Sequence, residues 1–295
     1  MKNNVLIIGN GFVGSKMVNH FIANNHSNSE VYHLHGLKYF DHQVGINVIE
    51  NKLATSNTDY VINCVGYTGS PNVDGCEDNK EDTWYLNVTF PTILASLCAK
   101  YNAKLINISS GCIYTGYEGE YTEECVPNFG LYADNSSWYS KTKHACELSF
   151  KQFDNVFNFR IRMPITGNLN ESKNYLTKIL KYNNLIDFLN SKTVINDLLE
   201  FTYKFINVDK REKLNPGNFN VVNPNPLSTK QITDLLDEYG FWNPHWKWIS
   251  LEELYKSTKC GRSNCVLDPS YTQQVTGIVL PTEEQSIRRL LENGK

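Results

Sequence analysis

The sequence lacks the features that would direct a protein to a membrane or to nucleic acid. Its 295 residues contain no apolar run long enough to cross a bilayer. The 28 lysines and arginines are balanced by 31 aspartates and glutamates, so no basic surface for DNA, RNA or anionic lipid is expected. The apolar run Val5–Ile8 is too short for a secretory signal. We therefore expect a cytoplasmic protein without nucleic-acid or membrane partners.

The eight cysteines lack the spacing of a metal site or of a redox pair. No Cys-x-x-Cys occurs, and the seven histidines are dispersed. Several cysteines lie in apolar segments, as Cys64 does within Val61–Val65, where a reduced thiol packs as a small hydrophobe. The sequence therefore predicts reduced cysteines and no metal site.

Short apolar runs alternate with helical patterns in the first half of the chain. The expected strands are Val5–Ile8, Val31–Leu34, Tyr60–Val65, Leu105–Ile108 and Phe157–Ile161. The expected helices are Ser15–Asn24, Thr83–Tyr101 and Tyr139–Phe153. Unbroken apolar strands that alternate with helices are typical of a parallel, doubly wound α/β sheet of the Rossmann type.

This alternation weakens after Met163 and Pro164. A strand at Phe219–Val222 and a helix capped by Ser228 are expected in the part that follows. We assign residues 1–165 to a Rossmann domain that binds NAD(P). Residues 166–295 are assigned mainly to a smaller C-terminal lobe that binds substrate, with elements near 190–223 returning to the Rossmann sheet.

A glycine-rich loop follows the first strand and opens the first helix. Its sequence, Gly9-Asn10-Gly11-Phe12-Val13-Gly14, is Gly-x-Gly-x-x-Gly. Glycines at this spacing permit a tight turn and a close approach of the backbone, so that a pyrophosphate rests on the helix N-terminus. We expect the loop to bind a nicotinamide dinucleotide.

The second strand lacks the acidic residue that usually binds the adenosine ribose. It continues into His35-Gly36-Leu37-Lys38, where no aspartate or glutamate occurs. An acid there accepts hydrogen bonds from the ribose hydroxyls and repels a 2′-phosphate. Its absence, with Lys38 nearby, favours NADPH over NADH, although NADH stays possible and Lys38 alternatively faces solvent.

Tyr139 and Lys143 are four residues apart and therefore share one face of a helix. A phenol with a pKa of about 10 is a poor acid–base group at neutral pH. We expect the neighbouring ammonium to lower the pKa of Tyr139, which suits hydride-transfer chemistry. The strand before this helix ends at Ser109 and Ser110, on the edge of the sheet where such folds build their sites.

With these residues the chain resembles the extended short-chain dehydrogenase/reductases that act on nucleotide sugars. The matching features are the glycine loop, Asn63 and Gly66 after the third strand, Asn87, Ser110, Tyr139 and Lys143. The resemblance implies that Ser110 holds the substrate ketone and that Tyr139 donates the proton. It implies that Lys143 activates Tyr139 and binds the nicotinamide ribose, and that Asn63 and Gly66 contact the cofactor.

Other segments are similar to the plant nucleotide-rhamnose synthase/epimerase-reductases. These segments are Thr68–Glu77, Gly111–Ile113, Tyr139–Lys143, Arg160–Ile165 and Gly261–Asn264. The resemblance implies conversion of UDP-4-keto-6-deoxy-glucose to UDP-L-rhamnose, with Cys112 and Lys178 serving epimerisation. Arg262 is expected to bind the substrate diphosphate, because a guanidinium suits phosphate and the surrounding segment matches. Alternatively, Cys112 packs in the core, Lys178 is a solvated helix lysine and Arg262 is a surface residue. The further substrate-binding residues expected are Thr68, Asn72, Asn87, Arg162 and Asn174.

Three other functions stay open at this point. The first is a reductase without epimerase activity, similar to dTDP-4-dehydrorhamnose reductase. The second is an epimerase/reductase similar to GDP-fucose synthase, which has His where this chain has Lys178. The third is a regulatory subunit that binds NADP without catalysis. Such a subunit is expected to have lost the tyrosine or the lysine of the catalytic pair, whereas this chain has both Tyr139 and Lys143. A homodimer is the expected assembly.

Overall fold

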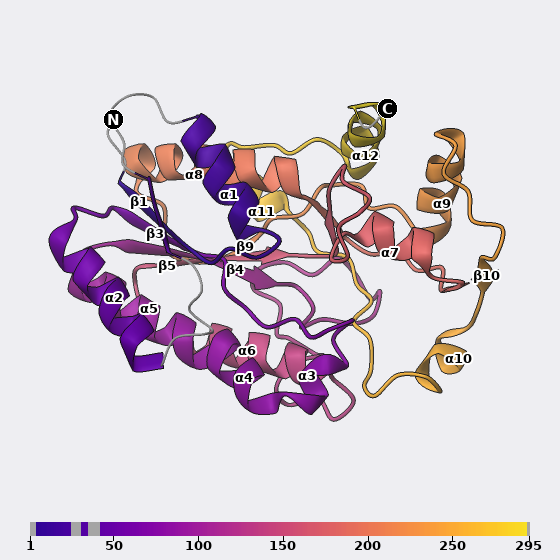
Figure 1. Cartoon of the computed structure of the whole chain (residues 1–295), viewed down its shortest axis with the longest axis horizontal. Helices are drawn as coiled ribbons and strands as arrows, with labels where there is room; N and C mark the ends of the chain where they lie inside the picture. Colours follow the sequence, from indigo (N-terminus) through magenta and orange to yellow (C-terminus); the bar gives the residue numbers. More distant parts are fainter. Residues whose placement is uncertain (1–3, 25–30, 35–41, 294–295) are drawn as a thin grey trace.

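The computed structural model describes residues 4–24, 31–34 and 42–293. Six parallel strands form one sheet in the order β2-β1-β3-β4-β5-β9 (Figure 1). Their bounds are β1 Val5–Ile8, β2 Val31–Leu34, β3 Tyr60–Asn63, β4 Lys104–Ser110, β5 Val156–Ile161 and β9 Gly217–Asn220. Because all strands run the same way, their carboxyl ends share one edge of the sheet. The predicted Rossmann-type α/β fold is confirmed.

Helices cover both faces of this sheet, as Figure 1 shows. One face carries α1 Gly14–Ala23, α8 Ile195–Glu212 and α11 Ser270–Thr276. The other carries α2 His42–Thr55, α5 Phe90–Lys100 and α6 Trp138–Phe150. Alternate residues of each strand point into the two resulting cores, as Ile7 and Ile8 of β1 do. No helix in the described ranges has the length and apolar character of a membrane span.

A row of four asparagine side chains crosses the middle of the sheet. Asn63, Asn107, Asn158 and Asn218 lie opposite one another in β3, β4, β5 and β9. Each amide nitrogen donates to the oxygen of the next asparagine, at 2.8, 2.9 and 2.8 Å. At the start of the row, Asn63 Oδ1 accepts from the backbone N–H of Val65 at 3.0 Å. The row therefore fixes the register of four strands and the path by which the chain leaves β3.

The second part of the chain forms a smaller layer beside the carboxyl edge of the sheet (Figure 1). Its helices are α7 Tyr175–Lys181, α9 Thr229–Glu238, α10 Leu251–Tyr255 and α12 Glu283–Asn293. Two short pairs accompany them, β6 Pro164–Ile165 with β8 Thr193–Val194, and β7 Asn184–Leu185 with β10 Lys247–Trp248. Residues of α7, α9 and α12 share one apolar cluster. Ser228 caps α9 with a capping box to Gln231. The division at residue 165 stays a prediction.

The prediction of one continuous helix over Thr83–Tyr101 is wrong, because the helical segment is interrupted and begins earlier. The structure has α4 Lys80–Trp84, a π-helical turn at Tyr85–Thr89, and then α5. Pro91 has no N–H to donate to the carbonyl of Asn87, which favours a wider turn at this place. Asn87 lies in this wider turn, and its side-chain amide bonds the backbone N–H and carbonyl of Tyr67.

Candidate active site

A cavity of about 1250 Å³ opens between the carboxyl edge of the sheet and the smaller layer. The glycine loop, the segment after β3 and the end of β4 line its first side. Helices α6 and α7 and residues 254–264 line the rest. Fourteen of the predicted site residues reach its wall, and they are Gly9, Gly11, Phe12, Val13, Gly66, Thr68, Asn72, Ser110, Cys112, Tyr139, Lys143, Arg162, Lys178 and Arg262.

The glycine loop has the backbone that a dinucleotide requires. Gly9 has a φ of +107°, a conformation that side chains with a Cβ rarely adopt. A Cβ at Gly14 would lie 2.4 Å from the carbonyl oxygen of Gly9, whereas a Cβ at Gly11 would meet nothing within 4 Å. The loop therefore closes tightly on α1 and leaves open space above Gly11, at the positive end of the helix. These residues fit a pyrophosphate.

Of the two predicted cofactor residues at and after the end of β3, Gly66 reaches the cavity wall and Asn63 does not. Gly66 lies where a Cβ would be 3.4 Å from Lys143 Nζ and 3.3 Å from Asn87 Oδ1. Asn63 does not reach the cavity wall, and its amide belongs to the asparagine row. Lys38 lies outside the described residues. His33 of β2 places Nε2 3.0 Å from the carbonyl oxygen of Gly9, a contact that the sequence pattern did not indicate.

Ser110, Tyr139 and Lys143 meet at one place on the cavity wall. Ser137 caps α6 through its hydroxyl, which accepts from the N–H of Ser140, and Tyr139 and Lys143 follow one turn apart. Lys143 Nζ is 5.7 Å from the centroid of the Tyr139 ring. Ser110 Oγ accepts from the N–H of Cys112 at 3.1 Å, which fixes the serine at the end of β4.

Burial controls the charges of this group more strongly than the lysine does. Burial raises the pKa of Tyr139, and hydrogen bonding to Ser110 only partly opposes that shift. Burial also lowers the pKa of Lys143. We expected Lys143 to lower the pKa of Tyr139, and for the protein alone this expectation is wrong. Tyr139 is therefore a neutral phenol at physiological pH, which is the form that donates a proton.

Cys112 and Lys178 line the same cavity from different layers. Cys112 lies two residues after Ser110, at the carboxyl end of β4. Lys178 lies on α7, whose first turn is capped by Asn174. Burial lowers the pKa of Lys178, and the charge of Lys173 lowers it further. The structure thus brings a thiol and a lysine of lowered pKa to the cavity that Tyr139 also lines.

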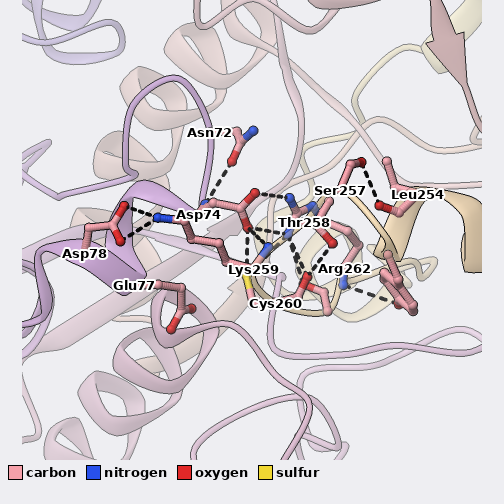
Figure 2. Close-up of polar contacts among 12 residues, drawn as sticks. Asn72, Asp74, Glu77, Asp78, Leu254, Ser257, Thr258, Lys259, Cys260 and Arg262 are labelled. Carbon is pink, nitrogen blue, oxygen red and sulfur yellow. Dashed lines mark hydrogen bonds and ion pairs between the residues drawn. The ribbon is translucent and has the colours of Figure 1, made fainter.

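Arg262 reaches the cavity while paired with a carboxylate (Figure 2). Its Nη1 lies 3.0 Å from Oδ1 of Asp74 and its Nη2 lies 2.8 Å from Oδ2. Burial opposes the charge of Asp74, but the Arg262 guanidinium and the Cys260 thiol hold the pKa of that carboxyl below its usual range. Asn72 Oδ1 accepts from the N–H of Asp74 at 2.8 Å. Asn72 therefore orients the residue that pairs with Arg262.

Two predicted substrate residues lie behind the wall rather than on it. Asn87 is 1% exposed, and its amide bonds the backbone N–H and carbonyl of Tyr67 and the hydroxyl of Thr142. Asn174 is fully buried and bonds the backbone of Thr166 and Leu176. Both side chains shape the loops that line the cavity.

Two residues that the sequence pattern did not indicate close the cavity. Lys173 Nζ donates to Thr68 Oγ1 at 3.1 Å and to the carbonyl of Gly69 at 2.5 Å, which joins the smaller layer to the segment after β3. Asp74 joins residues 254–264 to the same segment through Arg262. Neither has a local motif, because each acts across more than 100 residues. In the described part of the chain, no three His, Cys, Asp or Glu side chains gather as metal ligands would.

Comparison with known sequences places the chain in a family. The family model described as RmlD substrate binding domain matches residues 2–294. The bifunctional dTDP-4-dehydrorhamnose 3,5-epimerase/dTDP-4-dehydrorhamnose reductase of Arabidopsis thaliana is 33% identical over 243 residues, which are 80% of this chain and 77% of that protein. A trifunctional UDP-glucose 4,6-dehydratase/UDP-4-keto-6-deoxy-D-glucose 3,5-epimerase/UDP-4-keto-L-rhamnose-reductase of that plant is 34% identical over 239 residues, or 78% of this chain and 34% of the relative. The chain spans about a third of the length of the trifunctional relatives it matches.

Solved structures agree with this placement. The L780 UDP-rhamnose synthase from Acanthamoeba polyphaga mimivirus superposes with a TM-score of 0.84 at 27% identity, covering 98% of each chain. A dTDP-4-dehydrorhamnose reductase from Bacillus anthracis, solved with NADP, has a TM-score of 0.79 at 19% identity, covers 99% of each chain, and shows likeness of fold alone. The fold and the glycine loop define a dinucleotide-binding α/β protein. The chain belongs to the RmlD substrate binding domain family, so the predicted resemblance is confirmed.

Proposed function

We propose that the protein is an NADPH-dependent 3,5-epimerase/4-reductase that converts UDP-4-keto-6-deoxy-glucose to UDP-L-rhamnose. Reduction in a rhamnose pathway is supported by the names of the relatives, which are epimerase/reductases, reductases and a UDP-rhamnose synthase. One observation supports the second activity. Cys112 and Lys178 line the same cavity as Ser110, Tyr139 and Lys143.

The reduction uses the group on the sheet side of the cavity. The glycine loop would hold the dinucleotide, which supplies a hydride to C4 of the keto-sugar when it is bound. Ser110 holds the C4 oxygen, and Tyr139 donates its phenolic proton to that oxygen. Burial keeps Tyr139 protonated until this step. Lys143, near Tyr139 and Gly66, stabilises the phenolate that results.

The epimerisation uses the acidity that the C4 ketone gives to the hydrogens on C3 and C5. Inversion at either carbon needs a base on one face of the ring and an acid on the other. Cys112 and Lys178 approach the cavity from the sheet and from α7, which provides two separate directions. Reduction removes the ketone and with it the acidity of both carbons. Epimerisation therefore precedes reduction.

Arg262 is the proposed ligand of the substrate diphosphate. Its bonds to Asp74 use one proton of Nη1 and one of Nη2, and Nη1 also donates to the carbonyl of Cys260 at 2.9 Å. The edge formed by Nε and the other Nη2 proton makes no hydrogen bond to a residue in the described ranges. A phosphate is bound well by such a bidentate edge. Asp74 therefore holds the guanidinium while leaving an edge for the diphosphate.

The test is incubation with UDP-4-keto-6-deoxy-glucose and NADPH in deuterated water, with the product sugar identified by NMR. UDP-L-rhamnose with deuterium at C3 and C5 is the expected product. Cys112→Ser should lose the deuterium at those carbons while still reducing a substrate that is already epimerised. A Cys112→Ser enzyme that turns over the original keto-sugar at the wild-type rate would support a reductase without epimerase activity instead. Absence of NADPH oxidation with any 4-keto-6-deoxy sugar nucleotide would exclude both.

Assembly and compartment complete the proposal. All eight cysteines are free, which suits a reducing cytoplasm. We propose a homodimer in that compartment, and light scattering of the purified protein at micromolar concentration tests it. A mass of one chain, 33.8 kDa, would contradict the dimer without affecting the proposed chemistry.

A further inference from the structure

The segment that carries Arg262 belongs to no helix or strand. Residues 261–266, called the strap below, have no regular secondary structure, and the proposed ligand of the diphosphate lies among them. A segment of this kind is held in place by contacts with other parts of the protein, because it has no ladder of its own. Those contacts therefore determine where Arg262 lies relative to Ser110, at the other end of the substrate.

Arg162 joins the strap to the carboxyl end of β4. It is 1% exposed and directly follows β5. Its Nη1 donates to the carbonyl of Gly111 at 3.1 Å and to Ser263 Oγ at 2.7 Å, and its Nη2 donates to the carbonyl of Ser263 at 3.2 Å. Gly111 directly follows Ser110, and Ser263 directly follows Arg262. One guanidinium therefore bridges the neighbour of the serine that holds the ketone and the neighbour of the diphosphate ligand.

Asn190 extends this bridge along the strap. Its Oδ1 accepts from Arg162 Nη2 at 2.8 Å and from the N–H of Cys265 at 2.9 Å, and its Nδ2 donates to Asn264 Oδ1 at 3.1 Å. A guanidinium suits such a junction, because its planar donors bond several acceptors at fixed angles. Arg162 thus holds the strap directly at Ser263 and, through Asn190, at the next two residues.

The contacts of Arg162 leave it little to offer a substrate directly. Its two Nη atoms carry four protons, and these four bonds go to the Gly111 carbonyl, to two oxygens of Ser263 and to Asn190. Nε is buried without a hydrogen-bond partner. The Cys112 sulfur lies 3.8 Å from Nη1, farther than either oxygen that this atom bonds. The sequence predicts a direct contact with substrate for Arg162, whereas these contacts suit a residue that acts through its neighbours.

The charge of Arg162 is not balanced as that of a neighbouring arginine is. Arg160 is equally buried and donates from Nε and Nη2 to the two carboxylate oxygens of Glu147, at 2.9 and 2.7 Å. Arg162 forms no ion pair with a carboxylate of the described residues. A buried charge without an opposite charge is destabilising. Departures of this kind are expected at functional sites, which favours a role for Arg162 in the site over one in stability.

We propose that Arg162 is a positioning residue that fixes the distance between the diphosphate ligand Arg262 and Ser110. This inference rests on the proposed function, in which one nucleotide sugar is held at both ends. The diphosphate and the C4 ketone belong to the same molecule, so the strap has to present Arg262 at the span of that molecule. Arg162 sets this span through the strap and does not touch the diphosphate.

The experiment is a double-mutant cycle on Arg162 and Arg262. The Kd for UDP is measured by titration calorimetry on the protein saturated with NADPH. Arg162→Met should raise this Kd about tenfold, the effect of one charged hydrogen bond lost at Arg262. Adding Arg162→Met to Arg262→Met should change the Kd by less than about twofold, because the strap then has no ligand left to position. Two effects that multiply would show that Arg162 acts on the diphosphate independently and would overturn the proposal, as would a wild-type Kd in folded Arg162→Met.

The Kd for NADPH distinguishes positioning from a general loss of structure. The glycine loop lies between β1 and α1, so Arg162→Met should leave the Kd for NADPH within about twofold of the wild type. An equal loss of both affinities would overturn the proposal. Lys259→Met is the matched control for UDP, because it removes a cation close to the strap that pairs with Asp78 on the exposed surface. Its Kd should equal that of the wild type.

Ser263→Ala keeps the proposal testable if Arg162→Met does not fold. This variant removes one acceptor of the bridge and leaves the guanidinium in place. It should raise the Kd for UDP roughly threefold, the effect of one neutral hydrogen bond, and it should add little to Arg262→Met. An unchanged Kd in Ser263→Ala would then overturn the proposal.

The two proposals fail separately. UDP binding involves no turnover, so the cycle reports only on the strap, whereas deuterium exchange and NADPH oxidation report on the proposed reaction. A non-additive cycle in a protein that forms no rhamnose product would exclude the proposed function and leave positioning by Arg162 in place. A cycle whose effects multiply, in a protein that forms the product, would do the reverse.

Discussion

Replacing Arg262 by methionine should weaken the binding of UDP, because the guanidinium offers a free edge to a diphosphate. A hydrogen bond to a charged group contributes roughly 1.5–3 kcal/mol. That free energy corresponds to about 10- to 150-fold in Kd. The side chain of Arg262 is only 19% exposed, so solvent screens this interaction less than it would on an open surface. We therefore expect a Kd for UDP at least tenfold above that of the wild type.

Titration calorimetry with UDP measures this effect without turnover. Lys259→Met is the matched control, because Lys259 lies on the same segment but pairs with Asp78 on the exposed surface (Figure 2). Its Kd should stay within about twofold of the wild type, as expected for an exposed ion pair. The double variant Arg262→Met/Asp74→Asn should regain part of the lost affinity, since it removes the carboxylate left unpaired near the diphosphate. Wild-type affinity in Arg262→Met would refute this role of Arg262.

Three further predictions follow from buried and titrating groups. Glu147→Gln should lower the free energy of unfolding by about 3–5 kcal/mol because it leaves the buried Arg160 unpaired. Denaturant unfolding measures this effect, with Glu284→Gln as the control at an exposed site, and equal unfolding midpoints for the two variants would contradict it. If Lys178 is the acid, deuterium exchange should decline as pH rises through a value below the ~10.4 of an ordinary lysine, because burial lowers the pKa of Lys178. Lys178→Arg should move that decline to higher pH, and an unchanged profile would exclude the role. Tyr139→Phe should lose most of the reduction measured as NADPH oxidation but keep a slower exchange at C3 and C5, because Ser110 still holds the C4 oxygen. Exchange at the wild-type rate would contradict a hydrogen bond from the phenol to that oxygen during epimerisation.

The fold was predictable from the sequence to the extent that its signals are local. Val5–Ile8 is an unbroken apolar run, and the structure has β1 at those residues. Ser228 with Gln231 three residues later is a local capping signal, and the structure has α9 beginning at Thr229. The break within Thr83–Tyr101 was missed because a π-helical turn keeps the helical spacing of apolar residues on both sides.

The site residues were predictable where they belong to a family motif, but the pKa shifts and ion pairs of the site were not. Tyr139 and Lys143 share a helix face by spacing alone, yet the spacing does not report how deeply that face is buried. Burial reverses the expected direction of the Tyr139 pKa. Asp74 and Arg262 are 188 residues apart in the sequence, so no local pattern indicates that they pair. Such contacts exist only once the smaller layer is placed against the sheet.

The distribution of charge in the cavity explains how two reactions share one ketone. The C4 oxygen becomes negative twice, first when a proton leaves C3 or C5 and later when hydride reaches C4. A neutral Tyr139 beside Ser110 hydrogen-bonds that oxygen in the first case and gives up its proton in the second. An ionised Tyr139 would repel the oxygen in both. Burial of the phenol, which the lysine does not overcome in the protein alone, is therefore a condition for epimerising before reducing.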